Sequence, residues 1–217
     1  MPRRKCIWIG VGLVGLVMDG PLIAQEKLPL EQQKVSRLPP LPQPLDPVLQ
    51  EMFAKRRAQG GAIINLQLTT GHSPKFSQAA GTMAFAIRFD SVVPRRLIEL
   101  TIMRTAQIVG ADYEINQHIP LFKMCGYGDA QLAALPAWKS STLFDVKERA
   151  VLGYTEQMTH GGDVDDPTFA ELQKYFPPKG IVELTYTVGN YYANGLLTKA
   201  LRIQVETDGR ETVAGKC

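Results

Sequence analysis

The chain has 217 residues, which is enough for one domain with a sizeable core and a short additional segment. Its 45% hydrophobic and 21% charged residues are the composition of an ordinary globular protein. The formal net charge is +3, of which residues 1–25 contribute +2, so the rest has no large basic excess and no nucleic-acid partner is expected. Three scattered histidines without a Cys/His cluster predict no zinc-type metal site.

The N-terminus, residues 1–25, has the pattern of a signal peptide. A few basic residues precede the apolar run 6–18, which has the length of a signal-peptide core and is too short for a comfortable membrane span. We expect cleavage near Ala24 or Gln25, export to the periplasm or the medium, and no stable membrane span. Because the residues before the cut do not form a clean small-x-small site, an uncleaved N-terminal anchor is the alternative.

A Pro-rich segment, residues 26–45, comes next. Its prolines prevent a helix and favour an extended arm, which we expect to lie across its own domain or a neighbouring subunit. A Pro-rich ligand for another protein is the less favoured interpretation. The folded domain is expected over residues 46–205, and it begins at Asp46-Pro47 with an N-cap residue followed by the first helical residue. Residues 206–217 are polar, and we expect them to be frayed.

Glycine, proline and capping residues divide the domain into helices. Gly110 interrupts a long helical stretch. Asp145 and Glu148 form a capping-box pattern, and Asp166-Pro167 repeats the order of N-cap and first helical residue. No alternating strand run of useful length, Gly-rich phosphate loop or serine nucleophile elbow is present. The expected helices include residues 63–69, 76–87, 149–159, 168–176 and 181–201.

The stretch 98–118 carries three residues that can transfer protons: Glu99, Glu114 and His118. On the helix that begins after Gly110, Glu114 and His118 are four residues apart, so they share a face and can contact each other. A carboxylate that orients an imidazole is the smallest useful acid–base pair. Most Glu/His pairs at this spacing lie on a solvated surface and take no part in catalysis. The alternative is therefore that Glu114 and His118 form such a surface pair.

Glu99 lies on a helix that we expect to be buried on most sides. That helix begins near Pro94, and apolar residues fill most of its rows. A carboxylate among apolar side chains must be paired or have a raised pKa. The alternative to a catalytic role is therefore a salt bridge to Arg95, Arg96 or Arg104.

Several residues further along the chain have structural interpretations. Pro120 is expected to kink the helix that begins after Gly110, because proline removes a backbone hydrogen bond. The kink would lie just after His118 and open space beside the imidazole. Cys125 is predicted to be a small buried hydrophobe, and we do not expect it to pair with Cys217. Tyr191 belongs to an aromatic stripe on the last helix, a feature that is more often packing than a pocket wall.

The segment from Glu99 to His118 resembles the carboxymuconolactone decarboxylase family, which also includes alkyl hydroperoxidase D (AhpD). Members carry a Glu, then a helix rich in Leu, Ile and Ala, then a Tyr-Glu-x-x-x-His or Cys-x-x-Cys-x-x-x-His segment. Tyr113, Glu114 and His118 stand at the matching spacing after Glu99, and the likeness extends over residues 42–205. The other matching positions are His72, Pro74, Gly126, Leu132, Leu135, Glu148, Arg149, Ala150 and the last helix, 181–201.

The resemblance implies an all-α, AhpD-like bundle of roughly eight helices in a single domain, assembled as a homotrimer or homohexamer. It also implies a cofactor-free acid–base enzyme, a decarboxylase-type carbon–carbon lyase acting on a small carboxylated lactone or keto acid. His118 would be the proton donor, oriented by Glu114 or Glu99; isomerisation or lactone opening would fit the same residues. Weaker candidates for substrate binding are Tyr113, Arg104 and His72, and His72 is more simply interpreted as a helix-cap residue.

One departure from the family separates its two branches. In the peroxidase branch, cysteines stand where this chain has Ala111 and Glu114, and peroxide reduction needs a low-pKa thiolate beside a resolving thiol. Cys6, Cys125 and Cys217 have no partner at Cys-x-x-Cys spacing, so this route is disfavoured. The alternatives to the decarboxylase are an AhpD-like antioxidant protein that uses Cys125 and a non-catalytic exported binding protein on the same scaffold.

Overall fold

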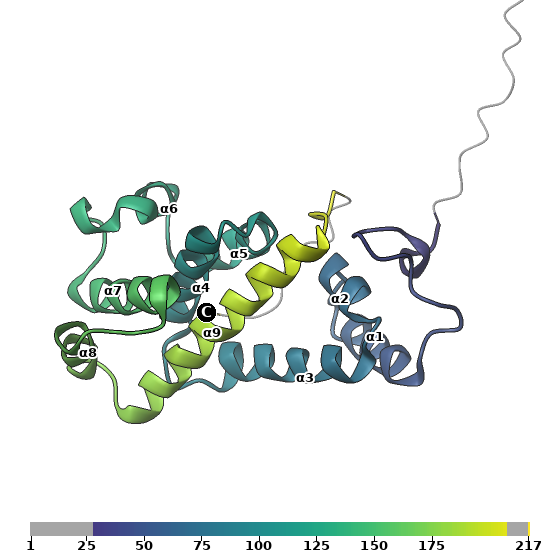
Figure 1. Cartoon of the computed structure of the whole chain (residues 1–217), viewed down its shortest axis with the longest axis horizontal. Coiled ribbons are helices and arrows are strands. Elements are labelled where there is room, and N and C mark those ends of the chain that lie inside the picture. Colours follow the sequence, from purple (N-terminus) through teal and green to yellow (C-terminus); the bar gives the residue numbers. More distant parts are fainter. Residues whose placement is uncertain (1–27, 208–216) are drawn as a thin grey trace, which may run out of the picture.

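The computed structural model describes residues 28–207 and residue 217 (Figure 1). Within these residues the chain is all-α, with nine α-helices, three short helical turns and no strand, which confirms the expected fold class. The signal-peptide pattern lies outside the described residues. None of the described helices has the length and apolar character needed to span a bilayer. The elements are η1 (Leu30–Gln32), α1 (Pro47–Ala58), α2 (Asn65–Thr70), α3 (Pro74–Phe85), η2 (Ala86–Asp90), α4 (Arg95–Val109), α5 (Asp112–Met124), α6 (Asp129–Ala134), η3 (Leu135–Ser140), α7 (Val146–Gly161), α8 (Asp166–Gln173) and α9 (Pro178–Leu201).

Helix boundaries follow the capping residues, with one shift of one residue. Asp46 caps α1 as expected, and the expected capping box starts α7. The expected N-cap of α8 is wrong: Asp165, not Asp166, has the extended backbone of a cap and accepts a hydrogen bond from Thr168 N at 2.8 Å. Pro94 is the N-cap residue of α4, so this helix begins near Pro94 as expected. Short-range capping chemistry therefore locates these helix starts to within one residue.

Helix α4 is the centre of the molecule and packs against α5, α7 and α9 (Figure 1). Leu100, Ile102 and Met103 on α4 have 0% exposed surface, as expected for a helix with apolar residues in most rows. Gly110 ends α4 in the left-handed conformation, with φ 66°, and the chain folds back so that α5 lies along α4. Polar side chains on the shared face of α4 and α5 are therefore buried together.

The Pro-rich arm lies across its own domain. Arg37 N donates to Leu201 O at 2.8 Å, and Gln204 N donates to Val35 O at 2.9 Å, so the arm follows the chain beyond α9. Side chains of the arm also complete a second, smaller hydrophobic cluster beside α1 and α2, where we expected a single core. Its buried members are Val35, Leu41, Leu49, Phe53, Ile63 and Leu68.

The chain after Val205 differs from expectation. The side chain of Glu206 accepts hydrogen bonds from Asn65 N at 2.6 Å and from Tyr113 Oη at 2.8 Å, so this residue is held rather than frayed. The polar composition of the tail suggested fraying, because composition does not reveal that buried hydrogen-bond donors elsewhere in the chain can bind the Glu206 carboxylate. Cys125 and Cys217 form a disulfide with their Cα atoms 5.0 Å apart, so the expectation that they stay unpaired is also wrong.

Candidate functional site

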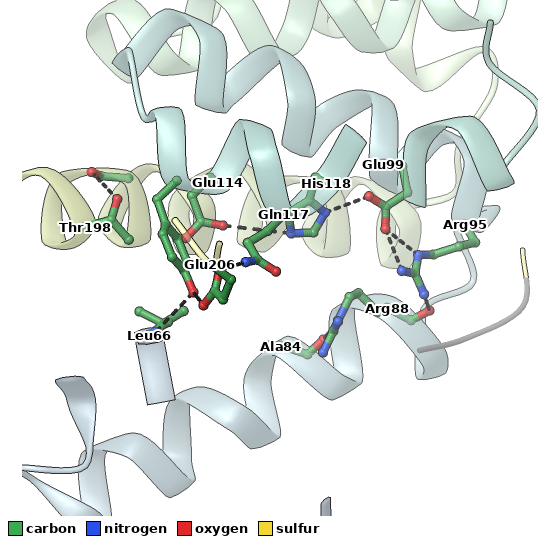
Figure 2. A network of polar contacts seen from close by, with 12 residues as sticks. Leu66, Ala84, Arg88, Arg95, Glu99, Glu114, Gln117, His118, Thr198 and Glu206 are labelled. Atoms are coloured by element: carbon green, nitrogen blue, oxygen red, sulfur yellow. Dashed lines mark hydrogen bonds and ion pairs between the residues drawn. The ribbon is translucent and has the colours of Figure 1, made fainter. Parts of the chain in front are cut away.

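Glu99, Glu114 and His118 meet between α4 and α5 (Figure 2). His118 Nδ1 lies 2.7 Å from Glu99 Oε2, and His118 Nε2 lies 3.8 Å from Glu114 Oε2. The three residues are 0%, 3% and 5% exposed, in the order Glu99, Glu114, His118. The imidazole thus has a carboxyl group on each side, and the pair predicted from four-residue spacing is buried rather than on a solvated surface.

Local sequence explains how these side chains come together. Glu114 lies in the first turn of α5 and His118 one turn later, so both point toward the same side of the helix. The left-handed turn at Gly110 brings α5 back along α4 and places Glu99 against the imidazole. On the α9 side, a side chain at Gly195 would approach Val109 to 2.9 Å, so glycine permits the close approach of α9. Helix α5 continues through Pro120 to Met124.

Glu99 is held in its ionised form by two partners. Burial by itself would raise the pKa of Glu99, but His118 and Arg95 outweigh it and lower the pKa below its ordinary value. Arg95 Nε donates to Glu99 Oε1 at 2.7 Å, while His118 Nδ1 donates to the other oxygen. The salt bridge with Arg95 and the contact with His118 therefore exist together. The hydrogen bond at Nδ1 leaves Nε2 as the nitrogen that faces Glu114.

Glu114 has the opposite electrostatic character. Burial raises the pKa of Glu114, and the charges of His118 and Arg88 oppose this only in part. Its Oε2 is too far from His118 Nε2 for a direct hydrogen bond, and its Oε1 has no hydrogen-bond partner among the described residues. A buried carboxyl group with unused hydrogen-bonding capacity is suited to exchange a proton with a small molecule that reaches it or with the neighbouring imidazole.

Two more side chains belong to this site, and the sequence did not assign either to it. The ring of Tyr191 on α9 meets the ring of His118 edge-on, with centroids 5.0 Å apart and planes at 88°. Burial raises the pKa of Tyr191, and the nearby charges of Arg88, Glu99 and Glu114 also act on it. The aromatic stripe that contains Tyr191 was the available signal, but it does not distinguish a pocket wall from packing. Arg88 gave no motif signal.

Tyr113 lies at the edge of the site in a structural role. Its hydroxyl donates to Glu206 and accepts from Leu66 N at 3.1 Å, so it connects α5 to α2 and to the chain after α9. Gln117, which is on α5 between Glu114 and His118, also donates to Glu206 (Figure 2). Burial and the charge of Glu206 raise the pKa of Tyr113 well above its ordinary value, so the hydroxyl stays protonated.

The other two predicted substrate-binding residues have their contacts elsewhere. Arg104 Nη2 lies 2.7 Å from Glu156 Oε2 on α7, an atom that also accepts from Trp138 Nε1. His72 is exposed and its Nε2 lies 3.0 Å from Pro39 O in the N-terminal arm. The structure brings neither residue into contact with His118. Within residues 28–207 and 217, no group of three or more His, Cys, Asp and Glu side chains has a metal-holding arrangement.

The arrangement has the features of a proton-transfer site. One carboxylate is ionised and fixes the imidazole, while the other carboxyl group is held toward its protonated form on the far side of the same ring. Paired carboxyl groups whose environments push their pKa values in opposite directions are the usual arrangement for separate acid and base roles. The site is therefore suited to move a proton through His118 Nε2.

Comparison with known proteins agrees with this architecture. Residues 74–157 match the sequence model of the Carboxymuconolactone decarboxylase family. A comparison with curated protein sequences finds no match. Among solved structures, an uncharacterized peroxidase-related protein with an alkylhydroperoxidase AhpD core from Ralstonia eutropha JMP134 superposes with a TM-score of 0.72 at 14% identity, covering 82% of this chain and 96% of that one.

Two further structures are similar. An uncharacterized peroxidase-related protein from Silicibacter sp. TM1040 has a TM-score of 0.72 at 14% identity, with 83% of this chain and 96% of that chain covered. The apo structure of the debrominase Bmp8 has a TM-score of 0.66 at 20% identity, with coverages of 80% and 92%. At these identities the likeness establishes the AhpD-like fold. The match of residues 74–157, the segment that holds Glu99, Glu114 and His118, to the carboxymuconolactone decarboxylase family model agrees with this fold and supports the family assignment.

Proposed function

We propose that this protein is an acid–base enzyme whose own side chains transfer a proton to or from a small carboxylated lactone or keto acid. The observation that supports the proposal is the buried line Glu99–His118–Glu114, in which burial and charge shift the pKa values of the two carboxyl groups in opposite directions. Tyr191 covers the imidazole on the α9 side, and both rings are buried there.

Decarboxylation is the proposed reaction. The bond between the substrate and its carboxylate breaks, CO₂ leaves, and the electron pair stays on the substrate as an enolate-like anion. His118, with protons on both nitrogens, then gives the proton on Nε2 to the carbon that lost CO₂. Ionised Glu99 stabilises the imidazolium, and Glu114 returns a proton to Nε2 from solvent. Isomerisation or lactone opening would use the same atoms with a different substrate.

The test is CO₂ release by the purified protein from a panel of carboxylated lactones and β-keto acids. His118→Asn is expected to abolish turnover. His160→Asn is the matched control, because His160 is exposed and its Nδ1 contacts only Glu156 O, at 2.8 Å, among the described residues. No turnover on any substrate by folded wild-type protein, or equal turnover by His118→Asn, would contradict the proposal.

A dithiol peroxidase is the second candidate, and the Cys125–Cys217 disulfide favours it. The thiolate of one cysteine would attack a peroxide, forming a sulfenic acid and releasing an alcohol. The second thiol would then displace water to give the observed disulfide, and an external dithiol would reduce it again. Alkylation of the reduced protein separates the candidates: the acid–base enzyme keeps its activity, and a peroxidase loses it.

We also propose that the chain forms a homo-oligomer through α3. This helix buries only Ser77, and its Phe76 and Met83, which are seven residues apart and so share a face, are 80% and 38% exposed. Large apolar side chains grouped on one helix are typical of a protein interface. Sedimentation velocity is expected to show an oligomer for the wild type and a smaller species for Phe76→Glu. A monomeric wild type would contradict this proposal.

A further inference from the structure

Arg88 lies beside the acid–base site on η2, the π-helical turn that follows α3 (Figure 2). Its backbone carbonyl accepts from Arg95 Nη1 at 3.2 Å, which places it next to the arginine that holds Glu99. Its Nε donates to Ala84 O at 2.9 Å. Single π-helical turns are rare and occur often at functional sites, and here the turn sets the position of a cation that the proposed proton transfer does not use.

The charge of Arg88 has no counter-ion in the described part of the chain. Arg95 is paired with Glu99, but no carboxylate of residues 28–207 lies within ion-pair distance of Arg88. Both guanidinium groups lie over the ring of Phe89, with carbon-to-centroid distances of 5.4 Å for Arg88 and 5.2 Å for Arg95. The contacts with Ala84 and Phe89 fix the guanidinium while leaving its two terminal nitrogens without a hydrogen-bond acceptor among the described residues.

Electrostatics shows that Arg88 acts on the same space as the acid–base residues. Burial raises the pKa of both Glu114 and Tyr191, and in each case the charge of Arg88 opposes the rise. Arg88 as a whole is also only partly buried. It is thus a half-buried cation whose charge acts on the buried carboxyl group of Glu114.

We propose that Arg88 is the subsite for a carboxylate of the substrate, an inference that rests on the proposed acid–base function. The two terminal nitrogens, which have no acceptor among residues 28–207, form the planar fork that binds a carboxylate through two parallel hydrogen bonds. The contacts of Nε and of the ring face hold this fork in place before the ligand arrives, which reduces the cost of binding. Binding there places the rest of a small molecule next to Glu114 and His118.

The chemistry determines which carboxylate Arg88 holds. A cation stabilises a carboxylate more than it stabilises neutral CO₂, so gripping the departing group would slow its loss. Arg88 therefore holds a carboxylate that the reaction retains. It follows that the preferred substrate carries a second acidic group besides the one that reacts, and that monocarboxylic keto acids are poorer substrates.

The test combines binding and kinetics. Succinate is the probe, with neutral succinamide beside it, and binding is followed by the NMR signals of the His118 ring, which locate the ligand. Wild type is expected to bind succinate and not succinamide. Arg88→Gln is expected to weaken succinate binding about 10- to 100-fold, as removal of a charged bidentate contact does, and Arg88→Lys to bind with intermediate affinity. The matched control is Arg37→Gln, since Arg37 is exposed and its guanidinium makes one hydrogen bond within residues 28–207, to Ala200 O at 3.2 Å.

The outcomes separate this inference from the proposed function. If wild type binds succinate and Arg88→Gln does not, the subsite stands even when no substrate turns over and the proposed function fails. If substrates turn over but Arg88→Gln and Arg88→Lys leave both KM and succinate binding unchanged, the subsite is wrong and the proposed function stands. Absence of succinate binding by wild type also overturns the subsite.

Discussion

Glu99 Oε2 accepts a hydrogen bond from His118 Nδ1 at 2.7 Å, across the turn at Gly110 that joins α4 to α5. Both side chains are buried, and the lowered pKa of Glu99 keeps it ionised at neutral pH. The pair therefore fixes a proton on Nδ1 and directs Nε2 toward Glu114.

Glu99→Gln removes the anion that orients His118. We expect kcat to fall about 10²- to 10⁴-fold, the usual effect of losing a positioned acid–base group. Arg95, whose side chain is 7% exposed, also loses its partner, so the free energy of unfolding should fall by about 3 kcal/mol. Steady-state kinetics measures the change in kcat, and urea unfolding measures the change in the free energy of unfolding. The control is Glu51→Gln, which breaks an exposed ion pair with Lys55 and should change neither kcat nor the free energy of unfolding. An unchanged kcat in Glu99→Gln would contradict the proposed role of Glu99.

The raised pKa of Glu114 predicts that the folded state loses stability as the pH rises. Burial raises the pKa of Glu114 above the ordinary value of 4.5, so the folded state binds this proton more tightly than the unfolded state does. The resulting stability is present below about 4.5 and is lost as the pH rises through the folded-state pKa. Glu114→Gln lacks this loss, so its free energy of unfolding should increase relative to wild type as the pH rises from about 4.5 through the raised folded-state pKa of Glu114. Urea unfolding at several pH values measures the difference, and a constant difference would contradict the raised pKa.

Reduction of the disulfide should weaken the fold but spare the proposed chemistry. Cys125 and Cys217 are 92 residues apart, and closing a loop of this length stabilises a domain by about 2–4 kcal/mol. Thermal unfolding with and without a phosphine reductant should show the corresponding fall in Tm, with proton-transfer activity retained at low temperature. The double variant Cys125→Ser, Cys217→Ser is the control, because it should not respond to the reductant. A wild-type Tm that is insensitive to reductant would show that the pair does not form.

Glu206 and Tyr113 should be energetically coupled. The carboxylate of Glu206 accepts from the Tyr113 hydroxyl at 2.8 Å and also binds Asn65 N and Gln117. Glu206→Gln and Tyr113→Phe should each lower the free energy of unfolding by about 1–3 kcal/mol, and the double variant by less than their sum. A double-mutant cycle by urea unfolding measures the difference. Additive effects would mean that Glu206 does not hold the end of the chain against α5.

Much of the fold follows from local sequence. Caps such as Asp46 and glycines such as Gly110 act within a few residues, so they locate helix ends to within a residue. Spacing within one helix puts Glu114 and His118 on the same face without knowledge of tertiary structure. Glu99 is far from both in sequence, and only its burial and the family resemblance connected it to the imidazole.

The remaining parts of the site depend on how distant segments pass one another. Tyr191 reaches His118 because Gly195 allows α9 to approach α4 and α5, and no local pattern encodes that approach. Arg104 was a reasonable partner for Glu99 by sequence distance, but it contacts Glu156 on α7 because it lies on another side of α4. The disulfide is unpredictable for the same reason, because its cysteines meet only after the whole helical domain has formed.

The central claim is that His118 Nε2 passes a proton to carbon, and the most direct test follows that proton. The reaction would be run in D₂O with a substrate that turns over, and deuterium at the reacting carbon of the product measured by NMR. The account predicts one deuterium at that carbon with wild type and His160→Asn, and no enzymatic incorporation with His118→Asn. Incorporation by His118→Asn at the wild-type rate would contradict the account, because the proton would then come from another group.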